Sequence, residues 1–444
     1  MTDAEQGTQF ERTLDRRTAD IVAACTRCGA CVDACPTPGI AGIEGMGEEI
    51  ASGVVDILDG GAGSAAAGRW AEVCCGSGFC ISACQDGINP RFMLAMARRA
   101  MAEGQPAPER REAGKRSFQA MSRGVKVLSR LQLPPQLMAR LSPKSTPARD
   151  AAPEIVFYTG CNLLKTPHIG LLCLDVLDKL GTDYEVHGGP SNCCGILQMR
   201  AGDMANGGRQ IEKTAERYAG TGAGEVVSWC PTCHIQFEEV VGDVAFDTTM
   251  FPTFLAARLD ALKPMLTERV EKRVALVEFP GALGVTDAVL LLLDAVDGVE
   301  VVTLDLPDDL PSAGYQMSAF TALPEFRQRM LAETFRAAER AGVDALVGVF
   351  HADHRELASH EDAWPFEIIN YMELIGAAMG VARDDVYKRL KLMQDVDAIF
   401  AEVADMAADY GLDAETVRDA IAVDILGDQL LPVDPARHPK TEHR

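Results

Sequence analysis

Short apolar runs and longer amphipathic stretches alternate through the middle of the chain. The runs at 154–160 (EIVFYTG), 183–189 (DYEVHGG) and 225–230 (EVVSWC) are rich in β-branched and aromatic residues and predict strands. The stretches at 168–181 and 210–220 repeat apolar residues every three or four positions and predict helices. Strands that alternate with helices favour an α/β fold with a parallel sheet.

The same order of elements returns about 120 residues later. RVALVEFPG at 273–281 resembles the first strand run, and TDAVLLLLDAVDGVEVVTL at 286–304 resembles the first helix and second strand. VDALVGVFHADHREL at 343–357 resembles the third strand and the segment after it. This internal repeat predicts two similar α/β halves, at 151–262 and 263–383.

The two ends of the chain carry other patterns. Residues 1–105 contain a Gly/Ala-rich insertion at 60–68 and end in a helical pattern, PRFMLAMARRAMAEG, which stops at Gly104. Residues 384–444 have helical apolar spacing to about residue 427 and then a Pro-rich polar tail. We expect these last helices to pack on the body of the protein or on a partner.

A basic connector joins the N-terminal region to the first α/β half. Residues 106–150 contain ten Lys or Arg residues and three acidic residues. Such a segment is either a solvated linker or a segment that lies against an acidic surface, of its own chain or of a partner.

Charge and hydropathy exclude several classes of protein. The chain has 42 Lys and Arg against 65 Asp and Glu, a net charge of −23, which argues against binding of nucleic acids. No apolar stretch follows the charged N-terminus, and the most apolar run, at 288–293, is far shorter than the ~20 residues that span a bilayer. We therefore expect a cytoplasmic protein with no transmembrane segment.

Fourteen cysteines in that compartment indicate metal or redox chemistry rather than disulfide bonds, because cellular thiols keep cysteines reduced. Their distribution is uneven. They are Cys25, Cys28, Cys31, Cys35, Cys74, Cys75, Cys80, Cys84, Cys161, Cys173, Cys193, Cys194, Cys230 and Cys233. Nearly half of the chain, after Cys233, contains none.

The first group is typical of bacterial ferredoxins. Cys25, Cys28 and Cys31 are spaced by two residues, and Cys35 follows after three more and precedes Pro36. In such a run the first three thiolates bind one cluster and the fourth binds the other cluster of a two-cluster module. A zinc site is the alternative, but zinc sites built from CxxC pairs do not explain the third cysteine or the Cys-Pro pair. The pattern predicts an N-terminal helical dicluster ferredoxin-like module.

The second group departs from this pattern, since Ser77 stands where a second cysteine is expected and Gln85 replaces the proline. The thiolate count still suffices for two [4Fe–4S] cubanes. The first would use Cys25, Cys28, Cys31 and Cys84, and the second Cys35, Cys74, Cys75 and Cys80. Because two of the latter are adjacent, a non-cysteine ligand or a three-iron cluster remains an alternative.

The third group lies on the first α/β half. Cys161, the pair Cys193-Cys194 and Cys230 each follow a predicted strand, at the edge where parallel sheets place ligands, and Cys233 completes a CxxC pair. Adjacent cysteines suit an expanded cluster with bridging thiolates. A simple cubane or a zinc site that uses four of the five is the alternative.

These motifs resemble those of heterodisulfide reductase-like iron–sulfur proteins. The resemblance rests on Asn192-Cys193-Cys194-Gly195 and Cys230-Pro231-Thr232-Cys233, which match the cysteine-rich "CCG" domain of that family. Over about residues 15–382 the chain looks like a dicluster ferredoxin subunit fused to a CCG subunit. The resemblance implies that the five cysteines bind a noncubane [4Fe–4S] cluster.

The second half lacks the cysteines that the family repeats. Gly281 stands at the first ligand position, Ser312-Ala313-Gly314 near the Cys-Cys-Gly, and His351-Ala352-Asp353-His354 at the CxxC. Either His351, Asp353 and His354, with His360 as a further candidate, bind zinc or a similar metal, or this half is a degenerate repeat retained for packing or for a partner surface.

Three further residues have simpler interpretations. Cys173 lies in an apolar helix and is expected in the core. His168 and His187 lie near the cluster loops, and we expect ordinary hydrogen-bonded histidines there.

In the resembled family, two facing noncubane clusters split a disulfide, and this chain has ligands for one. We therefore expect an electron-transfer subunit that relays electrons from a flavoprotein to the noncubane cluster. The expected partners, in a hetero-oligomer, are an electron-transfer flavoprotein, a flavin dehydrogenase or demethylase, or a heterodisulfide reductase-like flavin subunit. No Gly-x-Gly-x-x-Gly follows a strand, so no flavin is expected in this chain. The alternatives are a thiol–disulfide oxidoreductase at the single noncubane cluster, and a scaffold without redox activity.

Overall fold

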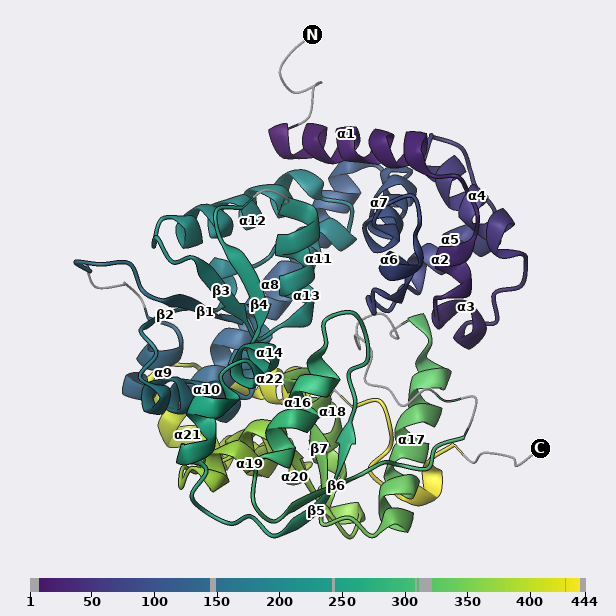
Figure 1. Ribbon diagram of the computed structural model, residues 1–444. Helices are drawn as coiled ribbons and strands as arrows, with labels where there is room; N and C mark the ends of the chain where they lie inside the picture. Colours follow the sequence, from purple (N-terminus) through teal and green to yellow (C-terminus); the bar gives the residue numbers. More distant parts are fainter. Residues whose placement is uncertain are drawn as a thin grey trace.

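The computed structural model describes most of the chain. The described residues are 8–143, 149–241, 244–307, 310, 322–427 and 429–439. Figure 1 shows an N-terminal helical body in purple and blue, a first sheet beside it, and a second sheet below both.

The N-terminal body is built from short helices around the first two cysteine groups. They are α1 (Gln9–Ala24), α2 (Ala30–Asp33), α3 (Thr37–Ile40), α4 (Gly47–Leu58), α5 (Ala65–Glu72), α6 (Phe79–Ala83) and α7 (Pro90–Glu103). A capping box between Thr8 and Glu11 begins α1. Asn89 caps α7, which ends at Gly104, so the helix predicted there is confirmed. Trp70 and Phe92 are buried in the core of this body.

The described part of the basic connector is helical, as α8 (Ala107–Gln132) and α9 (Pro135–Leu141). Arg123 forms an ion pair with Asp419 at 2.9 Å, and Arg140 lies 3.1 Å from Asp175. Leu128 of α8 is fully buried. The connector therefore lies against acidic residues of its own chain, and the interpretation as a solvated linker is wrong.

The first α/β unit contains a four-stranded parallel sheet of order β2-β1-β3-β4. Its strands are β1 (Ile155–Gly160), β2 (Tyr184–Gly188), β3 (Glu225–Ser228) and β4 (Asp247–Met250). Its helices are η2 (Asn162–Lys165), α10 (Pro167–Leu180), η3 (Pro190–Asn192), α11 (Ile196–Arg200), α12 (Met204–Ala219), α13 (Pro231–Ile235), the π-helical η4 (Gln236–Val241), α14 (Phe251–Ala256), α15 (Leu259–Leu262) and η5 (Lys263–Met265). The three predicted strands and the parallel sheet are confirmed, whereas β4 was not predicted.

The second unit contains another four-stranded parallel sheet, of order β6-β5-β7-β8. Its strands are β5 (Lys272–Val277), β6 (Val299–Val302), β7 (Ala345–Gly348) and β8 (Glu367–Asn370). Its helices are α16 (Val285–Asp294), α17 (Pro324–Ala341), α18 (His351–Leu357), η7 (Ala358–Ala363) and α19 (Tyr371–Ala378). Each sheet places its first strand between its second and third, so the carboxyl ends of those strands meet at one edge.

The C-terminal segment packs on the body of the protein, which is one of the two placements expected from the sequence. It forms α20 (Val386–Leu392), α21 (Val396–Asp409), α22 (Ala414–Ala420), the π-helical η8 (Ile421–Leu426) and η9 (Pro435–Arg437). Leu390, Ile399 and Ile421 share an apolar core with Leu128 of α8.

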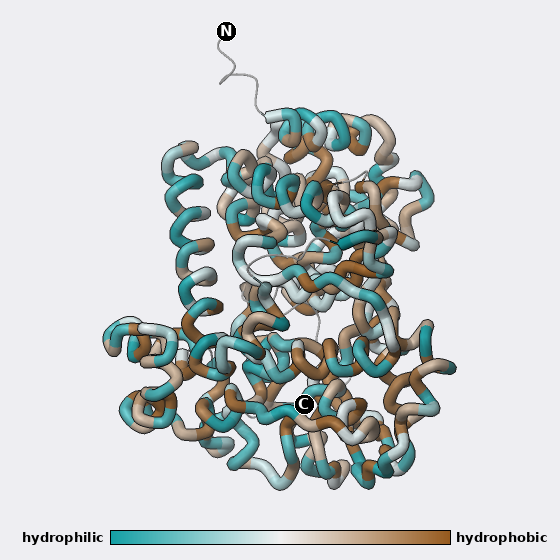
Figure 2. Tube along the Cα trace, turned by 90° about the vertical axis from the view of Figure 1, so that its left-hand side faces the viewer, coloured by the Kyte–Doolittle hydropathy of each residue, from teal (hydrophilic) through white to brown (hydrophobic). Residues whose placement is uncertain are grey.

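Hydrophobic segments run through the interior of the protein. In Figure 2 many helices are brown along one side and teal along the other, as expected for amphipathic helices that cover a core. Within the described ranges, no helix combines the length and the apolar character needed to cross a membrane.

Candidate functional site

The five cysteines of the third group meet at the carboxyl edge of the first sheet. Cys161 follows β1, Cys193 and Cys194 precede α11, Cys230 follows β3, and Cys233 lies in α13. Their thiols contact one another in a chain that runs from Cys161 through Cys193, Cys194 and Cys233 to Cys230. All but Cys230, which is partly exposed, are buried. The structure therefore brings together the whole set that the sequence indicated.

Gly195 explains why a glycine follows the two adjacent cysteines. Its φ of 75° is left-handed, and a Cβ at this position would lie 2.3 Å from the carbonyl oxygen of Gly207. Its N–H donates a hydrogen bond to Cys193 Sγ at 3.4 Å. A larger residue here would move the loop that holds both sulfurs.

Hydrogen bonds distinguish the five thiols from one another. The pKa of Cys193 is lowered to about 4, because the thiols of Cys161 and Cys194 donate to its sulfur and the Gly195 N–H supports them. The pKa values of Cys161 and Cys194 are raised, since each shares its proton with Cys193 and is buried. Cys233 also accepts a hydrogen bond from the hydroxyl of Tyr158 at 3.4 Å.

The chemistry of this donor set fits an iron–sulfur group. Five soft sulfur ligands converge at a buried point, and four suffice for a tetrahedral zinc site. Two of them, Cys193 and Cys194, are adjacent in the chain and their thiols interact. The N–H and O–H donors around the sulfurs are the groups that tune the reduction potential of such a site.

The N-terminal cysteines lie close to one another. Burial, together with charges on Cys25, Cys84 and Cys28, raises the pKa of Cys31 to about 12. These four thiols therefore lie close together, as expected for the first cubane.

The second set gathers in the same way. Burial, together with charges on Cys74 and Cys35, raises the pKa of Cys75 to about 12. Burial and the charges of Cys74, Cys35 and Cys31 raise the pKa of Cys80. Because Cys80 also interacts with Cys31, the two sets are neighbours.

The loop of the second set keeps the shape of the first. Gly29 and Gly78 both have φ of 80° and both precede the short helix that carries a cysteine, Cys31 on α2 and Cys80 on α6. Ser77 occupies the position that corresponds to Cys28, and its hydroxyl hydrogen-bonds to Cys75. Cys75 therefore contacts Ser77, the residue that stands in place of the expected cysteine.

Two polar side chains contact Cys35 of this set. The indole Nε1 of Trp70 donates to Cys35 Sγ at 3.3 Å, and Thr37 Oγ1 lies 3.2 Å from the same sulfur. No motif in the sequence distinguishes Trp70 or Tyr158 as a sulfur partner. Both residues lie in apolar stretches, and this pattern predicts only that they are buried in the core.

A cavity of about 290 Å³ opens beside the five cysteines. The second α/β unit forms its opposite wall with Phe279, Phe350, His351, Asp353 and Arg355. Burial raises the pKa of Asp353 to about 7. The half without cysteines therefore shapes the space in front of them.

The structure does not bring His351, Asp353 and His354 to one point. His351 Nδ1 accepts a hydrogen bond from Trp229 Nε1 at 3.2 Å, and Asp353 accepts one from the backbone N–H of Phe350. His354 lies against Asp385 instead, with Nε2 2.6 Å from Oδ2.

The remaining candidates lie apart from the cysteines or in ordinary surroundings. His360 is buried between the rings of Phe335 and His438. His187 pairs with Glu185 at 2.7 Å, as expected of an ordinary histidine. Cys173 is fully buried in α10, as predicted.

His168 departs from its expectation. Both of its ring nitrogens are buried, and they face carboxylates at 3.3 and 3.8 Å without a hydrogen bond of good geometry.

The loop after β5, where Gly281 stands at the first ligand position, contacts the N-terminal body. The N–H of Ala282 donates to the carbonyl oxygen of Ser77 at 2.7 Å. A Cβ on Gly281, whose φ is 145°, would lie 2.5 Å from that same oxygen. The second position of this motif, Ser312-Ala313-Gly314, lies outside the described residues.

We expect Gly281→Ala to lower the iron content by up to about four atoms per chain, one cubane. The new methyl group would push Ser77 away and move the loop of Cys75 and Cys80. Gly284→Ala is the matched control, because Gly284 also has a left-handed φ, of 62°, but has open space around it. Metal analysis of both purified variants checks this, and equal iron contents would contradict it.

Residues 155–238 match the family profile of the CCG cysteine-rich domain, a domain found in heterodisulfide reductase subunits. The matched segment contains all five cysteines of the third group. A search of curated proteins found no match to the chain. Together with the fourteen cysteines, the domain indicates an iron–sulfur or redox-related function.

Proposed function

We propose that this chain is the iron–sulfur electron-transfer subunit of a heterodisulfide reductase-like complex. It relays electrons between a flavoprotein partner and a noncubane [4Fe–4S] cluster. The partner is an electron-transfer flavoprotein, a flavin dehydrogenase or demethylase, or a heterodisulfide reductase-like flavin subunit, and no flavin binds to this chain. The second α/β unit, which shares its strand order with the first, is in this proposal a CCG-like repeat that has lost its ligands.

The observation that carries the proposal is that cysteines of all three groups lie in one continuous apolar core. The core includes Cys31 and Cys80 from the N-terminal body and Cys194 and Cys233 from the first α/β unit. Cys74 and Thr232, which stands within the CxxC pair, line one further cavity, of about 210 Å³. Redox groups bound to these cysteines would be shielded from water. They would also lie in one core that extends from the N-terminal body into the first α/β unit.

In this proposal each cysteine set holds one group. Cys25, Cys28, Cys31 and Cys84 bind one cubane, Cys35, Cys74, Cys75 and Cys80 bind the second, and Cys161, Cys193, Cys194, Cys230 and Cys233 bind the noncubane cluster. When bound, these groups supply one-electron redox chemistry. The protein contributes burial and hydrogen bonds from Tyr158, Trp70 and the Gly195 N–H, which tune the potentials.

The test is metal analysis and electron paramagnetic resonance of the chain purified without oxygen. We expect about twelve irons per chain and reducible signals, from three four-iron groups. Fewer than about eight irons, or no reducible signal, would contradict the three-cluster assignment. Reduced electron-transfer flavoprotein should then bleach the visible absorbance of the chain, and bleaching by dithionite alone would exclude that flavoprotein as the partner.

The cavity in front of the five cysteines favours a second candidate, a thiol–disulfide oxidoreductase. A disulfide bound there would take up two protons and two electrons, the latter supplied one at a time by the flavoprotein through the iron–sulfur groups, and leave as two thiols. Asp353, whose pKa is near 7, would hold a proton on the cavity wall opposite the sulfurs.

Ala352→Trp separates the two candidates, because Ala352 lines the cavity and is not one of the cysteines. If the chain reduces disulfides, the added indole should abolish thiol release from a small disulfide and leave reduction by the flavoprotein unchanged. If the chain is a relay alone, the wild type releases no thiol.

A further inference from the structure

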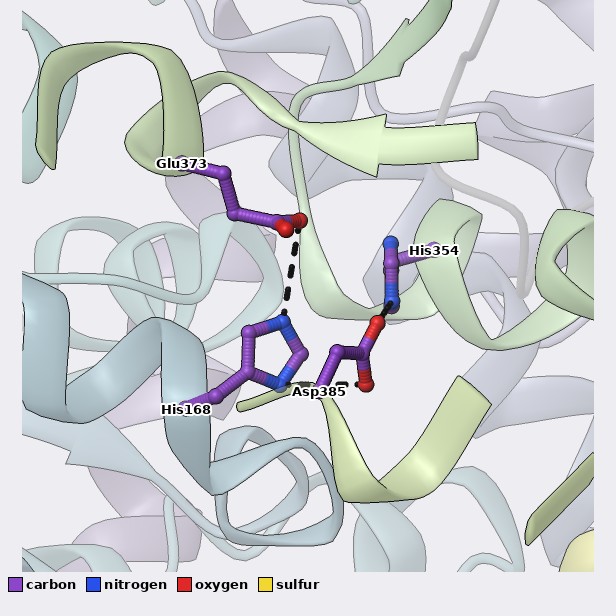
Figure 3. A group of neighbouring side chains, drawn as sticks. All are labelled: His168, His354, Glu373 and Asp385. Carbon is purple, nitrogen blue, oxygen red and sulfur yellow. Dashed lines mark hydrogen bonds and ion pairs between the residues drawn. The ribbon is translucent and has the colours of Figure 1, made fainter. Parts of the chain in front are cut away.

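Figure 3 shows a cluster of four neighbouring side chains that could bind a metal ion, none of which is a cysteine. His168 comes from α10, His354 from α18, Glu373 from α19, and Asp385 caps the start of α20. One nitrogen or oxygen from each residue lies within 4.8 Å of those of the other three. The four residues therefore join the first α/β unit, the second unit and the C-terminal helices at one point.

Three of the four side chains are buried and Glu373 is partly exposed, and the ring nitrogens of His168 and Nδ1 of His354 make no hydrogen bond of good geometry. His168 is 2% exposed. Nδ1 faces Asp385 Oδ1 at 3.3 Å and Nε2 faces Glu373 Oε1 at 3.8 Å (Figure 3). A buried polar group left without a partner costs about 1–3 kcal/mol. An ion among the four side chains would remove that cost.

The charges in the cluster point to a cation. Two carboxylates face two imidazoles, and a divalent ion balances two carboxylates while both imidazoles stay neutral. Lys388 is near, but its ammonium group contacts Glu361 at 2.7 Å and the carbonyl oxygen of Ile368 at 3.0 Å. The ammonium group of Lys388 is therefore paired with Glu361, which lies outside the cluster.

We propose that His168, His354, Glu373 and Asp385 bind one zinc ion. Two imidazole nitrogens and two carboxylate oxygens are a set of four ligands that a borderline divalent ion accepts in tetrahedral geometry. Asp385 also lines a surface depression with Glu361 and Lys388, which gives the ion a route from solvent.

The proposed zinc has a consequence for the cavity beside the cysteines. His354 lies on the same seven-residue helix, α18, as the cavity residues His351, Asp353 and Arg355. An ion that ties His354 to α10 would hold α18 against the first α/β unit. The site is structural, and it stands whether or not the chain transfers electrons.

Zinc analysis of the full chain, separate from iron, is the first test. After dialysis against micromolar zinc we expect one zinc per chain, and at least a tenfold weaker affinity in His168→Gln and Asp385→Asn. His360→Gln is the matched control, because His360 is also buried with an unpartnered Nδ1 but lies outside the cluster. Zinc-edge X-ray absorption of the wild type should show nitrogen and oxygen neighbours at about 2.0–2.1 Å.

Several outcomes would overturn the proposal. A wild type that retains no zinc would do so, and would show that the imidazoles are protonated instead. Equal zinc contents in Asp385→Asn and His360→Gln, or a sulfur shell at about 2.3 Å in the absorption spectrum, would place the zinc at cysteines. If His168→Gln does not fold, Asp385→Asn and the wild-type spectrum decide the question.

Discussion

Glu239→Ala should lower the free energy of unfolding by about 3–5 kcal/mol, because it leaves a buried arginine without its counter-charge. Arg91 and Glu239 pair at 2.7 Å, and the side chain of each is 7% exposed. Asn89 donates a second hydrogen bond to the same carboxylate at 2.6 Å. Arg91 comes from α7 and Glu239 from η4, so the pair fastens the N-terminal body to the first α/β unit. Denaturant unfolding followed by circular dichroism measures the change.

The same substitution should also affect the second cysteine set. Arg91 donates to the carbonyl oxygen of Gly76 at 2.9 Å, directly after Cys74 and Cys75. We expect iron to be lost at a lower denaturant concentration than in the wild type. Glu72→Ala is the control, because the ion pair of Glu72 with Arg69 is exposed and worth at most about 1 kcal/mol. Equal destabilisation by the two variants would contradict the assigned role of the buried pair.

The hydropathy pattern predicted the sheets well where strands are buried on both faces. All six residues of β1 are buried, and the strand begins with the apolar and aromatic residues Ile155, Val156, Phe157 and Tyr158. β4 escaped prediction because it is the edge strand, with the short and largely polar sequence DTTM and an exposed first residue. Periodicity finds strands through burial, so an edge strand with polar residues gives little signal.

Candidate ligands could be grouped from sequence because cysteine spacing reflects cluster chemistry. The structure places the five cysteines of the third group together and the N-terminal cysteines close to one another. The assignment of the N-terminal cysteines to two separate clusters stays a prediction. Contacts between distant segments gave no such signal. The cluster of His168 and Asp385 joins residues more than 200 positions apart, and so does the contact of Gly281 with Ser77. Their positions depend on how the α/β units, the N-terminal body and the C-terminal helices pack on one another, which a local sequence pattern does not predict.

The functional comparison with the largest expected effect is between two buried cysteines, Cys194 and Cys173. Cys194 lies at the centre of the five-thiol chain, in contact with Cys193 and Cys233. Cys173 is equally buried, but it lies in the apolar core with α10 around it. A cysteine to serine change removes one soft ligand in the first case and only a small core side chain in the second.

If the five cysteines hold the proposed four-iron group, we expect Cys194→Ser to remove about four irons and the resonance signal of that group, while the two N-terminal sets stay loaded. Electron transfer to the five-cysteine site should fall by more than about 100-fold, since even groups outside a ligand set cost 10–100-fold when removed. Cys173→Ser should keep its full iron content and its electron transfer. Iron analysis, resonance spectra and stopped-flow reduction of both variants measure these effects. A Cys194→Ser chain that keeps about twelve irons and transfers electrons at the wild-type rate would show that the sulfur at the centre of the set is not a ligand, and the relay would then have to end at the N-terminal sets.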